Sequence, residues 1–188
     1  MNKASLVGWL VAAGVLVIFC AGGYYLLRQV LWSFGIPYSS YWVANYDGYS
    51  FSMHGDRVDC VWTHPFPDDP DSPQLFLRVA NRDDLGVFHV RRFPESLAQE
   101  ILPFKIEDAV VPDYENKCTE YAYRGAVYEV DRICYDHGEV VAAFLYGSQF
   151  QVSPSPQGPF LELPTTRQKL LEVFGKPRKW VRVRKFGP

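Results

Sequence analysis

The chain has 188 residues, with 21 acidic and 19 basic side chains and a formal net charge of −2 at neutral pH. This near balance lacks the basic signature of a nucleic-acid-binding protein, so we expect no nucleic-acid partner. Aromatic residues make up 16% of the chain, and 14 glycines and 14 prolines recur among them. That composition favours strands and tight turns over a helical bundle.

The N-terminal segment Ala4–Leu27 holds no charged residue, and Lys3 and Arg28 flank it. An α-helix rises about 1.5 Å per residue and a bilayer core is roughly 30 Å thick, so this segment is long enough to cross a membrane once. A cleaved secretory signal is the alternative, because residues 21–23 are small. Signal sequences usually have a shorter apolar region, and we therefore predict a retained transmembrane helix.

The predicted boundary between the anchor and the domain lies at Pro37. Proline cannot continue a helix, so the anchor with its interfacial end spans residues 1–36 and an exported domain spans 37–188. The flanking charges orient the helix only weakly, but a short N-terminal tail is easily left in the cytoplasm. We expect a single-pass protein of the inner (cytoplasmic) membrane, with the lipid bilayer as a partner and the C-terminal domain in the periplasm or outside the cell.

Three small residues of the anchor, Ala4, Gly8 and Ala12, fall four apart and therefore share one helix face. Small residues at this spacing allow two helices to approach closely, which predicts a contact between membrane helices. The alternative is that alanine and glycine are simply common in membrane helices.

The exported domain opens with an alternation of apolar and polar residues that is typical of strands with one buried face. Asp47 and Gly48 form a pair that favours two-residue hairpin turns, and Cys60 is expected to point into the core. The predicted strands are 41–46, 49–54 and 57–62.

A second hairpin and a short helix follow an acidic loop. The loop, 64–73, clusters carboxylates that suit calcium, but its spacing matches no calcium-binding loop, so we expect solvated charge. The hairpin strands are predicted at 75–79 and 86–92, and the helix at 95–102.

A third group of strands is predicted at 118–123, 126–135 and 139–146. The run Val140–Phe144 is almost wholly apolar, which indicates a central strand covered on both faces. A helix capped by Thr165 or Thr166 should end at Gly175, before a last strand from Trp180 to Phe186. The fold class is therefore α+β: an N-terminal single transmembrane helix followed by a mainly antiparallel β-sheet domain with two short helices.

Cys118 and Cys134 are the candidate disulfide pair, if the compartment oxidises thiols. They would face each other on neighbouring strands if the connecting loop is centred on Ala126. A two-residue turn at Arg124 and Gly125 would instead place Cys118 opposite Asp131. The pairing therefore needs a bulge or a longer loop, and Cys60 would stay free.

No residue pattern predicts catalysis, and we assign no catalytic residue, metal ligand or cofactor. Cys134 and His137 are the closest candidate for a thiol and its base, but a structural role is favoured. Glu129 and Asp131 could present two carboxylates on one strand face, as glycosidases require, but such pairs are usually solvated charge. The histidines have no spacing that places two on one metal ion.

The last predicted strand carries a stripe of alternating basic and aromatic side chains, formed by Trp180, Arg182, Arg184 and Phe186 beside Lys179. With the valines turned inward, such a stripe suits an acidic protein, anionic lipid headgroups or, less well, nucleic acid. The alternative is that the cations protect an edge strand from pairing with another sheet, which explains the charges but not the tryptophan.

These observations predict a membrane-anchored, non-catalytic cell-envelope binding protein that holds or neutralises a protein partner, such as an immunity-like or inhibitor protein. An accessory subunit of an inner-membrane or secretion complex is the alternative, with the small-residue helix face as its contact. An envelope hydrolase is the third hypothesis. The sequence names neither the protein partner nor a small-molecule ligand.

Overall fold

The computed structural model describes residues 15–17, 20, 22–24, 26, 39–63, 74–111, 114–123, 130–147 and 149–185. The chain divides into two compact units, one of residues 1–40 with 183–188 and one of residues 41–182. In the first unit, the described residues between 15 and 26 are helical. No helix within the described residues is both long enough and apolar enough to cross a membrane. Most of the predicted anchor, including Ala4, Gly8 and Ala12, lies outside the described residues, so the transmembrane helix stays a prediction.

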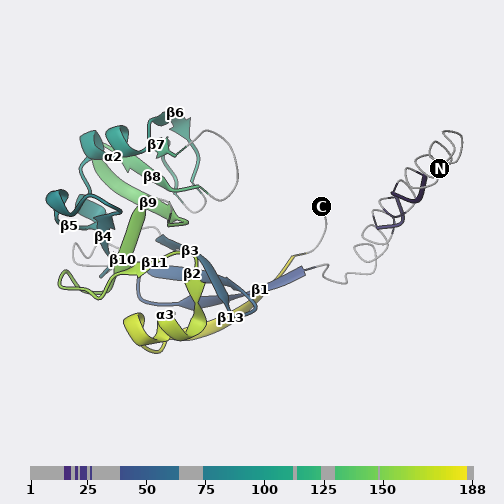
Figure 1. Ribbon diagram of the computed structural model, residues 1–188. Coiled ribbons are helices and arrows are strands. Elements are labelled where there is room, and N and C mark those ends of the chain that lie inside the picture. Colours follow the sequence, from purple (N-terminus) through teal and green to yellow (C-terminus); the bar gives the residue numbers. More distant parts are fainter. Residues whose placement is uncertain are drawn as a thin grey trace, which may run out of the picture. The chain divides into compact units, whose positions relative to one another are not determined.

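A nine-stranded sheet dominates the fold (Figure 1). Its strands follow the order β13-β1-β2-β3-β9-β8-β7-β6, and β12 pairs separately with β3. The pairings from β1 to β6 along this order are all antiparallel. The bounds are β1 Ser39–Asn45, β2 Tyr49–His54, β3 Arg57–Thr63, β6 Phe104–Ala109, β7 Cys118–Ala122, β8 Arg132–Asp136, β9 Glu139–Leu145, β12 Thr165–Thr166 and β13 Lys179–Lys185.

A second, four-stranded sheet and four short helical segments complete the described fold. The sheet has the order β11-β10-β4-β5. Its strands are β4 Phe76–Val79, β5 Val87–His89, β10 Phe150–Ser153 and β11 Leu161–Glu162. The α-helices are α2 Glu95–Ile101 and α3 Arg167–Phe174, and the 3-10 turns are η1 Asp83–Leu85 and η2 Val90–Arg92. A mainly antiparallel α+β domain with two short helices is therefore confirmed.

Two tight hairpins form where the sequence places them. Asn45 lies opposite Ser50, so Asp47 and Gly48 make the two-residue turn, and Gly48 has a φ of 81°. Asp136 lies opposite Glu139 in the same way. The positive φ at Gly48 is the conformation that the turn demands and that glycine adopts without steric cost.

The helix α3 begins and ends with the predicted capping residues. The Thr166 hydroxyl accepts a hydrogen bond from the Lys169 backbone N–H at 3.3 Å, which satisfies one of the donors left open at a helix start. Gly175 follows the last turn with a φ of 70°, and its N–H donates to the carbonyl of Leu171. Leu170 is fully buried, which fixes this helix on the core.

The main core lies on one face of the large sheet and extends to the small sheet. The fully buried side chains Phe51, Val61 and Ile133 come from strands of the large sheet, and Leu77 and Phe150 come from the small one. The strand β9 lies between β3 and β8, as its apolar run predicts. Residues that are distant in the sequence thus contribute to the same core.

Cys60 is buried, as predicted, but it lies outside the main core. Ser52 lies opposite Cys60, but Met53 lies opposite Val58, because a β-bulge shifts the register between β2 and β3. The bulge gives Val58 and Val61 to the main core, although they are three residues apart. Cys60 is buried on the other face of the sheet, beside the Ser52 hydroxyl at 3.1 Å.

Candidate functional site

The candidate site is a surface at the start of α3, and we call Arg57, Arg167, Lys169 and Trp180 the α3 surface. Its residues come from the β2–β3 hairpin, from α3 and from β13. The backbone N–H of Arg167 donates to the carbonyl of Asp56 at 2.9 Å, which ties the helix start to the hairpin. The pairing of Thr165 with Val58 holds the segment before the helix on β3.

The guanidinium of Arg167 lies over the indole ring of Trp180, with its central carbon 4.6 Å from the ring centroid. Arginine stacks on aromatic faces through its planar, weakly hydrated cation, and the contact leaves the edge of the guanidinium free to donate hydrogen bonds. Trp180 itself is half-buried and packs against the main core. The stack therefore restrains the position of the exposed Arg167 side chain.

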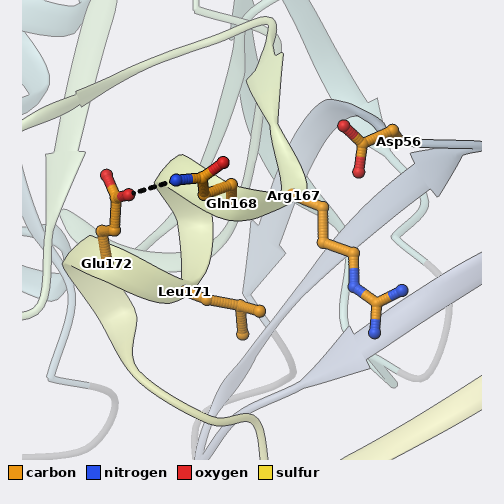
Figure 2. A pocket seen from close by; sticks show the side chains of 5 residues that line it. All are labelled: Asp56, Arg167, Gln168, Leu171 and Glu172. Atoms are coloured by element: carbon orange, nitrogen blue, oxygen red, sulfur yellow. Dashed lines mark hydrogen bonds between the residues drawn. The ribbon is translucent and has the colours of Figure 1, made fainter.

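An open hollow of about 410 Å³ lies beside this stack. Figure 2 shows its five lining side chains, with Arg167 and Leu171 on one side of the helix. On the other side, the Gln168 amide donates to the Glu172 carboxylate at 2.9 Å. A second hollow of about 490 Å³ lies between the hairpin and the helix start, where Arg57 and Lys169 line it. Both hollows combine cations with the Asp56 carboxylate, and the first also contains Glu172 and the apolar Leu171, so the surface offers charged groups of both signs to a protein side chain.

The predicted basic and aromatic stripe is only partly present as a surface. Arg182 is exposed, whereas Trp180, which was predicted to project to the same side as Arg182, is half-buried and packs against the main core. Arg184 is exposed on the part of β13 that belongs to the first unit, and Phe186 lies outside the described residues. Lys179 lines a different hollow, beside Asp47 and Arg178.

Sequence reasoning missed Arg57, Arg167 and Lys169. Arg167 and Trp180 are separated by a helix and a turn, so no spacing rule relates them. The predicted helix start at Thr166 was the available signal, because it placed the basic side chains at 167 and 169 on the first exposed turn. Their approach to β13 depends on how α3 packs on the sheet.

The candidate cysteine pair lies together on the face opposite the main core. Cys118 and Cys134 are both buried in a small cluster with Val111 and Ala142. Cys134 lies opposite Glu120 in the β7–β8 register, so the two cysteines are diagonal neighbours and the predicted face-to-face register is wrong. Both thiols are free in the structure, and their disulfide stays a prediction.

The buried thiols are poor nucleophiles near neutral pH. Burial raises the pKa of Cys134, and the neighbouring Glu120 carboxylate adds to this rise. Burial likewise raises the pKa of Cys60. The thiolate is the reactive form of cysteine, so these environments favour a structural role.

Asp131 is a buried structural carboxylate and not the solvated charge that its sequence context predicts. It accepts hydrogen bonds from the backbone N–H groups of Tyr146, Gly147 and Gln149 at 2.6, 3.0 and 2.7 Å. Gly147 is required there, because a Cβ would lie 2.3 Å from the carbonyl oxygen of Leu163. Glu129, the other candidate carboxylate, lies outside the described residues.

Among the described residues, no group of three or more histidine, cysteine, aspartate or glutamate side chains is placed to hold a metal ion. Comparison of the chain with protein-family models, curated proteins and solved structures found no match. The α3 surface therefore has to be interpreted from its own chemistry.

Proposed function

We propose that this protein is a membrane-anchored, non-catalytic binding protein of the cell envelope, and that its domain holds or neutralises an acidic protein partner at the α3 surface. The observation that carries the proposal is the Arg167 guanidinium stacked on Trp180 beside an open hollow. Tryptophan and arginine are the residues that most often dominate protein interfaces.

The chemistry of the surface supports an acidic partner segment. Arg57, Arg167 and Lys169 are all exposed around one helix start, and Arg57 already pairs with the Asp59 carboxylate at 2.8 Å, so the proposal depends on Arg167 and Lys169. A guanidinium donates two parallel hydrogen bonds to a carboxylate, so Arg167 suits an aspartate or glutamate of the partner. Leu171, half-buried in the same hollow, offers apolar contact beside the charge.

The apolar segment Ala4–Leu27 supports the second part of the proposal, namely that the domain is tethered to the inner membrane. Tethering raises the local concentration of a binding domain near the membrane, so a partner that acts there would be met efficiently. Orientation is tested with Asp47→Cys, an exposed turn position, in a chain that also carries Cys20→Ala. We expect an impermeant maleimide to label it in intact spheroplasts; labelling only after lysis would place the domain in the cytoplasm.

The binding proposal is tested with a fluorescent oligo-glutamate peptide and the full chain in a neutral detergent. We expect saturable binding that weakens with salt, and a loss of about tenfold in affinity for Arg167→Glu. Lys117→Glu changes the net charge equally at a distant exposed position and serves as the matched control. Equal weakening by both variants, or no binding by the unaltered chain, would overturn the proposed surface.

A further inference from the structure

Among the described strands, β6 forms an open edge of the large sheet. It pairs with β7 on one side and is the last strand in the order (Figure 1). All residues from Phe104 to Asp108 are exposed. In an antiparallel strand, alternate residues direct their N–H and C=O groups away from the neighbouring strand, so this edge can accept a further strand.

The charges on β6 are arranged symmetrically about its central residue. Lys105 and Glu107 flank Ile106 and lie on one face of the strand, where their side chains form an ion pair at 3.1 Å. An antiparallel second copy centred on Ile106 would place Lys105 opposite Glu107 of that copy, twice. The four side chains would then alternate in sign, and each would have an opposite charge beside it and across from it.

The other face of β6 supplies apolar surface. Phe104 is 40% exposed and Ile106 is 37% exposed, while Val110, just beyond the strand, is 80% exposed. In the same alignment Ile106 would face Ile106 of the second copy, and Phe104 would flank this contact. Exposed apolar area of this kind is stabilised when another strand covers it.

The geometry of β6 limits how far such pairing extends. The register between β6 and β7 shifts between Ile106 and Ala109, and Asp108 has a φ of 54°. This bulge ends the regular part of the strand after Glu107. A two-fold pairing centred on Ile106 occupies the β6 edge of each copy. No β6 edge is left for a third copy, so the assembly stops at a dimer.

We propose that β6 is a self-association surface, on which a second copy of this chain adds its own β6 in antiparallel register about Ile106. The partner is a second copy because reversing the strand about Ile106 exchanges the positions of Lys105 and Glu107, so each meets the opposite charge. The proposal is independent of the α3 surface, which lies on other elements.

Charge reversal tests the proposal in the full chain in detergent, with mass measured by analytical ultracentrifugation. We expect the unaltered chain to dimerise, and Lys105→Glu or Glu107→Lys to raise the dissociation constant about tenfold or more. The double variant Lys105→Glu with Glu107→Lys restores alternation and should dimerise again, as should an equal mixture of the two single variants. Lys176→Glu is the matched control, and circular dichroism checks the fold of each variant.

The register is tested by disulfide trapping in a chain carrying Cys20→Ala. Ile106→Cys should form a covalent dimer on oxidation, whereas Lys105→Cys alone should not, because its predicted opposite residue is Glu107. A monomeric unaltered chain would overturn the proposal and leave the edge to a strand of another protein. A dimer that survives the charge reversals but is lost in Gly8→Leu would overturn it in favour of the membrane segment.

Discussion

The two ends of the large sheet differ in the charges they present. At the β13 end, Lys179 and Arg182 are exposed and of one sign. At the β6 end, Lys105 and Glu107 are exposed and of opposite sign. A strand edge that carries one sign repels a copy of itself and attracts a partner of opposite charge, whereas an edge with alternating sign accepts a copy of itself. The pattern of sign, and not the number of charges, separates the β13 edge from the β6 edge.

The two ends also differ in the interactions that stabilise them. At the α3 end, the ring of Phe174 packs against those of Tyr46, Tyr49 and Phe51, with centroids 4.9 to 5.9 Å apart. At the other end, buried polar groups fix the chain: the Tyr135 hydroxyl donates to the carbonyl of Phe93 at 3.1 Å. Apolar packing responds gradually to the volume removed, while a buried polar group that loses its partner carries the whole desolvation penalty.

The largest expected effect comes from removing the buried carboxylate of Asp131. Asp131→Ala should lower the free energy of unfolding by about 3–5 kcal/mol, because three backbone N–H groups lose a buried, charge-assisted acceptor. Urea unfolding followed by circular dichroism measures this change. Asp83→Ala, at an exposed carboxylate, is the control and should change stability by less than about 0.5 kcal/mol. A loss near that of the control would show that the Asp131 carboxylate does not stabilise this part of the chain.

A smaller loss of stability, graded with the volume removed, is expected from substitutions of Phe174. Phe174→Ala should lower the free energy of unfolding by about 2–3 kcal/mol, because the ring is partly buried, and Phe174→Leu by about 1 kcal/mol. The same urea titration measures both. If the leucine variant lost as much as the alanine variant, the shape of the ring and not its volume would matter, and the packing account of this end would be wrong.

The smallest effect concerns alkaline pH. Burial raises the pKa of Tyr46 to about 12, and burial also raises the pKa of Tyr49. The unfolded chain loses these protons near the ordinary tyrosine pKa of about 10, so folding is favoured fully below that pH and the contribution is lost as pH rises toward about 12. Tyr46→Phe should therefore flatten the decline of the melting temperature between about pH 10 and 12. An unchanged decline would show that Tyr46 ionises equally in both states.

The sequence predicted the local elements well because local chemistry decides them. The pair Asp47 and Gly48 supports a tight turn whatever surrounds it, and the capping hydroxyl of Thr166 acts on its own helix. The strands β6 and β10 were missed although apolar and polar residues alternate in both, because the alternation covers only about four residues and is a weak signal; pairing with neighbouring strands holds them extended.

The sequence by itself determined that an uncharged N-terminal segment precedes a strand-rich domain, and it determined the positions of the main turns and helix caps. The tertiary structure decided which side chains meet. The bulge in β3 turned Cys60 away from the main core, the burial of Asp131 made it a structural acceptor, and the packing of α3 brought Arg167 onto Trp180. The physical reason is that periodicity and capping act over a few residues, whereas register and packing join residues that are distant in sequence.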